Sequence, residues 1–122
     1  MKRWLAVLAV GALSLTVVST AFGKASSVVI TGYELGFFNG AVKSKTAACK
    51  QNRRVDLYER ESSGAESFLG FGKTDNFGRW SIVDSDGTGG DYFAKIKPKS
   101  GKFKKSGKKY TCTASTSPIF TR

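Results

Sequence analysis

The chain contains no histidine, only two cysteines, two prolines and one methionine among its 122 residues. Without histidine there is no imidazole to serve as a general base or as the commonest metal ligand. A Gly-x-Ser-x-Gly elbow and a cluster of metal-ligating residues are also missing, although a Ser–Lys pair stays open because both residue types are plentiful. These absences predict a protein that is not an enzyme, with no catalytic residues, no metal site and no cofactor.

The first 23 residues have the organisation of a secretory signal peptide. Lys2 and Arg3 give a positive start, residues 4–18 are almost continuously apolar, and Ala21-Phe22-Gly23 offers a small-x-small cleavage site. The apolar run is shorter than the roughly 20 residues that a membrane span needs. We therefore expect a helical signal peptide over residues 1–23, cleaved after Gly23, and a single domain over residues 24–122.

Acidic residues are scarce. The chain has 20 Lys and Arg against 9 Asp and Glu, and removal of Lys2 and Arg3 leaves a net charge of about +9. The residue directly after the expected cleavage site is Lys24 and not a cysteine that could carry a lipid, and residues 118–122 show no apolar anchoring tail. The sequence predicts a basic protein that is secreted and has no membrane span in its mature part.

The two cysteines, Cys49 and Cys112, both lie outside the signal peptide. In an oxidising compartment an isolated pair favours one disulfide, which here would close a loop of about 64 residues. Two free thiols are the alternative.

Short strands broken by turn residues account for the rest of the chain. Val55 and Leu57 alternate with polar neighbours, and so do Trp80 and Ile82. We expect seven strands, at residues 27–33, 37–44, 53–60, 67–73, 79–84, 92–97 and 110–115. The intervening segments 45–52, 61–66, 74–78, 84–91 and 99–109 are predicted to be turns or loops, and no helical period is visible after residue 23.

A set of short motifs resembles a known β-sandwich. The motifs are Gly40-x-Val42, Cys49, Arg54-Val55-x-Leu57-Tyr58, Gly72-x-Thr74-Asp75-x-x-Gly78-x-Trp80, Gly90-x-Tyr92-x-Ala94-x-Ile96 and Cys112-x-Ala114. Over about residues 38–115 the chain resembles the transthyretin-like, carboxypeptidase-regulatory-like domains of small exported bacterial proteins. The resemblance implies an all-β, seven-stranded antiparallel Greek-key β-sandwich. Some enzymes of this fold depend on histidine, and their activities are not expected here because the chain has no histidine.

Eight lysines crowd the segment from residue 95 to residue 109. Such a run of like charge is extended and solvated, and it can attract wall polymers, acidic glycans, nucleic acid or anionic lipid. A solubility role without a partner is the alternative. Lysine lacks the bidentate geometry of arginine, and few aromatics interleave the run, so specific nucleic-acid recognition is not expected. The candidate anion-binding residues are Lys95, Lys97, Lys99, Lys102, Lys104, Lys105, Lys108 and Lys109.

Three carboxylates surround a glycine-rich stretch at residues 84–91. Asp84, Asp86 and Asp91 supply oxygen ligands that Ca²⁺ prefers, but Thr88 and Lys95 stand where an EF-hand loop needs ligands. The pattern favours an ordinary flexible loop over a cation site.

The aromatic residues divide into two sets according to which face of the expected strands they would occupy. We expect one set in the core together with Val55, Leu57, Ile82 and Ile96, and the other on the surface, where rings can stack on sugars or pack at an edge. The predicted core set is Trp80, Tyr92, Phe38, Phe71 and Tyr110, and the predicted surface set is Phe37, Tyr58, Phe93 and Phe77.

Three functions follow from these patterns. The leading hypothesis is an exported non-enzymatic β-sandwich, with a structural or binding role at or beyond the cell surface, whose lysine segment contacts anionic polymers or surfaces. The second is a carbohydrate-binding module that uses exposed aromatics such as Phe93 or Tyr58. The third is an extracellular enzyme, or a protein-binding or inhibitor module acting through loops 61–66 or 84–91.

Overall fold

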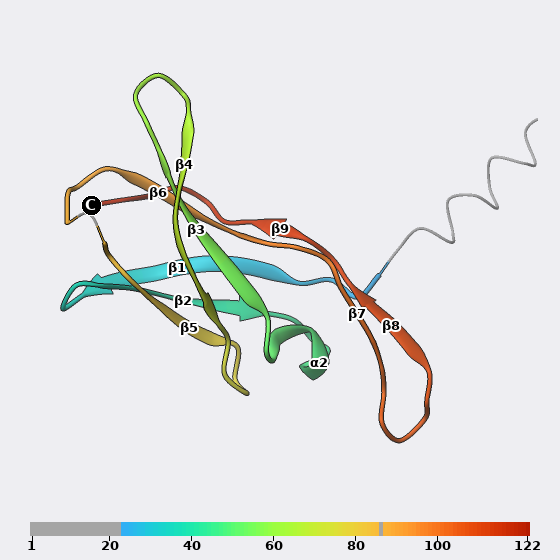
Figure 1. The fold of residues 1–122 in the computed structure, drawn as a ribbon. Coiled ribbons are helices and arrows are strands. Elements are labelled where there is room, and N and C mark those ends of the chain that lie inside the picture. The colour runs from blue at the N-terminus through green and yellow to red at the C-terminus, as the bar shows by residue number, and fades with distance from the viewer. Residues whose placement is uncertain (1–22, 86) are drawn as a thin grey trace, which may run out of the picture.

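A computed structural model describes residues 23–85 and 87–122, so the predicted signal peptide lies outside the described residues up to Phe22. The described chain is predominantly β-structure, and every paired set of strands is antiparallel (Figure 1). In chain order the elements are β1 (Ser27–Glu34), β2 (Phe37–Lys43), α2 (Ala47–Lys50), β3 (Arg54–Arg60), β4 (Glu66–Lys73), β5 (Arg79–Val83), β6 (Asp91–Ile96), β7 (Lys99–Lys102), β8 (Lys109–Cys112), β9 (Ser115–Thr116) and β10 (Phe120–Thr121).

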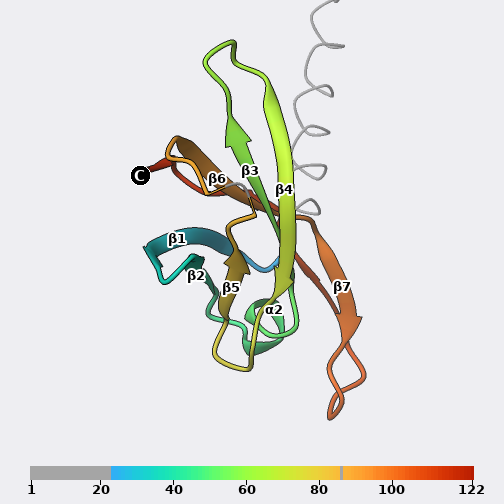
Figure 2. The same cartoon turned by 60° about the vertical axis from the view of Figure 1, so that its left-hand side comes forward.

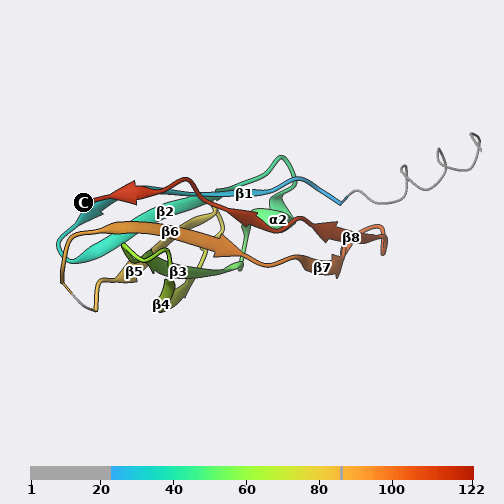
Figure 3. The same ribbon diagram turned by 90° about the horizontal axis from the view of Figure 1, so that it is seen from above.

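The strands form two facing sheets and a separate hairpin. One sheet has the order β1-β2-β5, and the other has the order β10-β6-β3-β4 with β9 also paired to β6. Seen from above, the β7–β8 hairpin and the C-terminus lie at opposite ends of the described structure (Figure 3). β7 and β8 form a two-stranded sheet of their own, in which Cys112 of β8 also bridges to Lys24, and they extend beyond the two facing sheets (Figure 2). The all-β expectation is therefore confirmed.

The expected number of strands is wrong, because the described residues contain ten strands in three sheets. Part of the expected loop 99–109 is paired as β7 and β8. The last expected strand, 110–115, is divided: its first residues belong to β8 of the hairpin, and Ser115 begins β9, which pairs with β6. β10 follows and also pairs with β6. These two short strands are separated by a segment that contains Pro118, which cannot donate a backbone hydrogen bond.

A short helix, α2, was not expected in the polar segment 45–52. It is a single turn, too short to show a hydrophobic period, and it buries one residue, Cys49. Its position depends on contacts from distant parts of the chain. Within the part of the chain that the structure describes, no helix is long and apolar enough to cross a membrane.

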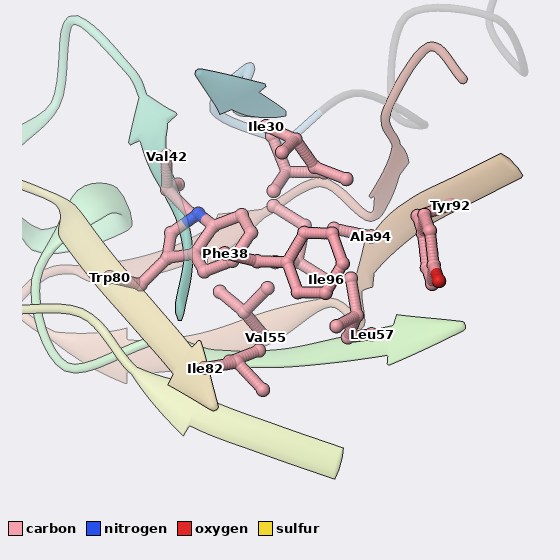
Figure 4. Close-up of a cluster of buried hydrophobic side chains, with 11 residues drawn as sticks. Ile30, Phe38, Val42, Val55, Leu57, Trp80, Ile82, Tyr92, Ala94 and Ile96 are labelled. Carbon is pink, nitrogen blue, oxygen red and sulfur yellow. The ribbon is translucent and has the colours of Figure 1, made fainter. Parts of the chain in front are cut away.

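The core lies between the two facing sheets and contains most of the residues expected there. Trp80 and Phe38 lie together in its middle, while Tyr92 lies at its edge (Figure 4). The hydroxyl of Tyr92 donates a hydrogen bond to the carbonyl of Thr88. A side chain at Gly40 would overlap the Trp80 indole, so the glycine provides the space that the ring fills. The buried cluster consists of Val28, Ile30, Phe38, Val42, Val55, Leu57, Trp80, Ile82, Tyr92, Ala94 and Ile96.

Three aromatic predictions are wrong. Phe71 is 54% exposed, because the pairing of β3 with β4 shifts between Leu57 and Tyr58 and inserts an extra residue into β4. That bulge places Phe68 and Phe71, which are three positions apart, opposite outward-facing residues of β3. Phe93 is only 1% exposed, since its ring stacks on Tyr58. Tyr110 is half-buried in the hairpin and not in the core.

Candidate functional site

The β7–β8 hairpin carries most of the predicted lysine cluster away from the sandwich. Lys102 and Lys109 lie directly opposite each other on the two strands, and Lys104, Lys105 and Lys108 occupy the connecting turn. All five are exposed, and none forms an ion pair with a described residue. Like charges in cross-strand positions destabilise a sheet, so other contacts must hold this hairpin together.

Two aromatic rings supply one such contact. The rings of Phe103 and Tyr110 are 4.8 Å apart between centroids. Tyr110 also pairs across the strands with Gly101 and lies over it, so that a side chain at Gly101 would collide with the phenol. In the turn, the backbone N–H of Phe103 donates to the carbonyl of Lys108 at 2.9 Å. An aromatic ring packed over a cross-strand glycine offsets the poor strand propensity of glycine.

The predicted disulfide fixes the base of the hairpin. The sulfurs of Cys49 and Cys112 are bonded at 2.01 Å, and both residues are fully buried. Cys112 pairs with Lys99 at the start of the hairpin, so the bond joins the hairpin to α2. No free cysteine is present among the described residues, and the alternative of two free thiols is therefore wrong.

Lys99 differs from the other lysines because its side chain points inwards. Its Nζ donates to the carbonyls of Ala48 and Gln51, each at 3.0 Å, and thereby caps the end of α2. Burial lowers the pKa of Lys99, and the nearby charge of Arg53 lowers it further. Lys99 thus anchors the hairpin, while Lys97 is exposed and Lys95 pairs with Glu66 at 3.2 Å on the sheet face.

Arg53 is a central residue of this region that the sequence patterns did not single out. It is 2% exposed, and its guanidinium donates to the carbonyls of Cys49, Lys97 and Thr113 and to the hydroxyl of Ser26. These four acceptors come from α2, from the segment before β7, from the segment after β8 and from the segment before β1. Burial lowers the pKa of Arg53. The sequence signal that could have pointed to Arg53 is the pair Arg53-Arg54 at the start of the alternating apolar and polar residues of β3.

The outer face of the second sheet holds a row of aromatic rings. Tyr58 of β3 lies between Phe93 of β6 and Phe68 of β4, with ring centroids 5.4 Å and 5.7 Å away. Phe68 is 52% exposed. Of the other rings expected at the surface, Phe37 and Phe77 are exposed as predicted but lie outside this row.

The carboxylates of the 84–91 segment are engaged by protein groups. Asp84 is fully buried at its side chain, accepts a 2.9 Å hydrogen bond from Tyr33 and pairs with the guanidinium of Arg122. Asp91 accepts a hydrogen bond from Thr121 at 2.7 Å, and Asp86 lies outside the described residues. Among the described residues no group of three His, Cys, Asp or Glu side chains could hold a metal ion.

Comparison of the chain with protein-family models, with curated proteins and with solved structures finds no match. The candidate functional surfaces are therefore the β7–β8 hairpin with its exposed lysines, called the lysine hairpin below, and the aromatic face of the second sheet.

Proposed function

We propose that the chain is an exported, non-enzymatic β-sandwich of the transthyretin-like type whose lysine hairpin binds anionic polymers at or beyond the cell surface. The strand order supports the resemblance: if β9 and β10 are counted as one interrupted strand, a three-stranded sheet faces a four-stranded one. The β7–β8 hairpin is then an insertion before the last strand. A disulfide and the absence of a membrane-spanning helix from the described residues are compatible with secretion.

One observation carries the binding proposal: five exposed lysines stand on a projecting hairpin, with no carboxylate of the described residues paired to them. The hairpin is short, and its base is held by the Cys49–Cys112 bond and by the contacts of Arg53 and Lys99. Unpaired charges on a braced element produce a local positive potential that attracts polyanions without requiring a shaped pocket.

The test compares two triple variants of equal charge. K104Q/K105Q/K108Q neutralises the hairpin turn, and K43Q/K45Q/K73Q neutralises three exposed lysines elsewhere on the sandwich. Retention on immobilised polyphosphate is measured along a salt gradient. We expect the hairpin variant to elute at clearly lower salt than the wild type, and the control variant to elute near it. Equal shifts for both variants would mean that net charge, and not the hairpin, determines binding.

The carbohydrate-binding alternative is modified by one observation. Phe93, one of the two rings on which that hypothesis depended, is buried, so it offers no face to a sugar. The exposed phenyl rings of the same surface are Phe68 and Phe71. Any sugar contact on this face would therefore be centred on β4.

A further inference from the structure

The outer face of β6, β3 and β4 combines exposed rings with cations. Phe68 and Phe71 are 52% and 54% exposed on β4, which is the edge strand of its sheet. The guanidinium carbon of Arg54 lies 4.0 Å from the centre of the Phe71 ring. The Nζ of Lys95 lies 4.9 Å from the centre of the Tyr58 ring. Cations at such distances are attracted to ring faces and are held beside them.

Carboxylates accompany these cations. Asp56 accepts a 2.8 Å hydrogen bond from the Nε of Arg54, and Glu66 accepts one from Lys95 at 3.2 Å. Side chains of Arg54 and Glu66 are 54% and 40% exposed, so both groups are also accessible to a ligand. The face therefore offers three kinds of contact within a few residues: apolar rings, hydrogen-bond donors with positive charge, and hydrogen-bond acceptors.

We propose that this face binds an acidic polysaccharide, with its uronate carboxylates on Arg54 and Lys95 and its sugar rings against Phe68 and Phe71. The proposal rests on the proposed function and narrows its ligand class from anionic polymers in general. Sugar hydroxyls are donors and need acceptors such as Glu66. The C–H faces of pyranose rings are apolar enough to pack on exposed phenyl groups.

A second copy of the chain fits the face less well. The cations Arg54, Arg60 and Lys95 outnumber the carboxylates Asp56 and Glu66 there, so two copies in contact through a two-fold axis would bring an excess of positive charge together. Like charges brought together at an interface are unfavourable.

Two grooves connect this face to the base of the lysine hairpin. One, of about 360 Å³, is lined by Tyr58, Lys95 and residues of β9, and the other, of about 220 Å³, by Arg54 and Lys99. Both grooves are also lined by Asp56, Lys97 and Pro98, so they adjoin. A polymer that lies along them contacts Tyr58, whose ring packs on Phe68, and Arg54, which lies over Phe71, and it approaches the base of the hairpin at Lys99.

The experiment measures affinity at fixed ionic strength for three probes: polygalacturonate, its full methyl ester, and inorganic polyphosphate. These carry rings with charge, rings without charge, and charge without rings. We expect wild-type protein to bind polygalacturonate more tightly than either other probe. In F68A/F71A the affinity for polygalacturonate should fall about tenfold, because two ring contacts are lost. Its affinity for polyphosphate should not change, and a cooperative thermal unfolding transition checks that the variant is folded.

The matched control is F77A, which removes an exposed phenyl ring that also carries an arginine, Arg79, 5.0 Å from its centre. It should bind all three probes like the wild type. Equal losses in F77A and F68A/F71A, or no loss in either, would overturn the sugar-ring contact while leaving the hairpin proposal intact. Tighter wild-type binding to polyphosphate than to polygalacturonate would overturn it as well. Failure of the wild type to bind any anionic probe would instead overturn the proposed function.

Discussion

The guanidinium carbon of Arg122 lies 3.9 Å from the centre of the Tyr33 ring, and both side chains bind the carboxylate of Asp84. This arrangement joins the end of β1 to the segment after β5 and to the last residue of the sequence. Arg122 also exchanges two backbone hydrogen bonds with Gly90. The C-terminus, which carries Arg122, lies at the end of the sandwich opposite the lysine hairpin (Figure 1).

Replacing Arg122 by alanine should lower thermal stability by several degrees, because the buried Asp84 carboxylate loses its cation. The comparison is R79A, whose partner Asp75 is 45% exposed and whose ion pair should contribute little. Both are measured by thermal unfolding followed by circular dichroism. If R122A and R79A have the same melting temperature, the buried Arg122–Asp84 pair stabilises the fold no more than the exposed Arg79–Asp75 pair does.

Replacing Arg53 by alanine should lower the free energy of unfolding by about 3 kcal/mol, because several largely buried acceptors lose their donor at once. Arg60 at the end of β3 is exposed and forms no ion pair with a described residue, so R60A serves as the control and should have a much smaller effect. Urea unfolding gives both values. A loss in R53A no greater than that in R60A would contradict the central role assigned to Arg53.

Removing the disulfide should lower the free energy of unfolding by about 4 kcal/mol, because Cys49 and Cys112 are 63 positions apart and close a long loop. Urea unfolding of the wild type is measured with and without a reducing agent. The C49A/C112A variant should resemble the reduced wild type and should not respond to the reductant. A wild type that is equally stable with and without the reductant would contradict the prediction.

The stability of the 74–78 turn should depend on pH through Asp75. Its carboxylate accepts the backbone N–H of Arg79 at 2.9 Å and that of Phe77 at 2.8 Å. The Arg79 backbone hydrogen bond is the main cause that lowers the pKa of Asp75 below its ordinary value of 3.8. The folded state therefore binds this proton less readily than the unfolded state, and the carboxylate stabilises the fold above pH 3.8.

That contribution is lost as the pH falls from 3.8 through the lower pKa of the folded state. The wild type should be more stable than D75N at neutral pH, and the difference should shrink in the acid range. Urea midpoints across the pH range measure it, with E34Q as a control for loss of an exposed carboxylate. A difference between the wild type and D75N that does not depend on pH would refute the assignment.

The lysine hairpin should open more readily when Tyr110 is replaced by alanine, because the ring contact with Phe103 and the cover over Gly101 are lost. Trypsin cutting after Lys104 or Lys105 should become about fivefold faster, since a contact of this kind contributes about 1 kcal/mol. Mass spectrometry of a timed digest identifies the cut. F77A is the control, and its hairpin should be cut at the wild-type rate.

Local patterns were enough to place most of the sandwich strands and the centre of the core. Val55 and Leu57 alternate with polar residues, as do Trp80 and Ile82, and a strand exposes alternate residues to opposite faces. The disulfide was also predictable, because two cysteines allow only one intramolecular bond. The aromatic face could be predicted only in part, since the phase of β4 changes within the strand.

Phe71, Phe93 and Lys99 show what only the tertiary structure decided. Phe71 faces outwards because one extra residue enters β4, and the bulge is defined by its pairing with β3. Phe93 is buried although its phase points away from the core, because Tyr58 of the neighbouring strand covers it. Nothing in the sequence distinguishes Lys99 from the other lysines of the cluster. Its side chain points inwards because the fold brings two carbonyls at the end of α2 within hydrogen-bond distance of its Nζ.

The sequence by itself determined the strand-forming segments, the cysteine pair and the excess of positive charge, because each of these depends on residue type and local spacing. The tertiary structure decided which lysines are exposed and which aromatic rings share a face. It also decided that Arg53 donates hydrogen bonds to four separate segments of the chain. These features depend on partners far away in the sequence, and the folding of the sheets brings those partners together.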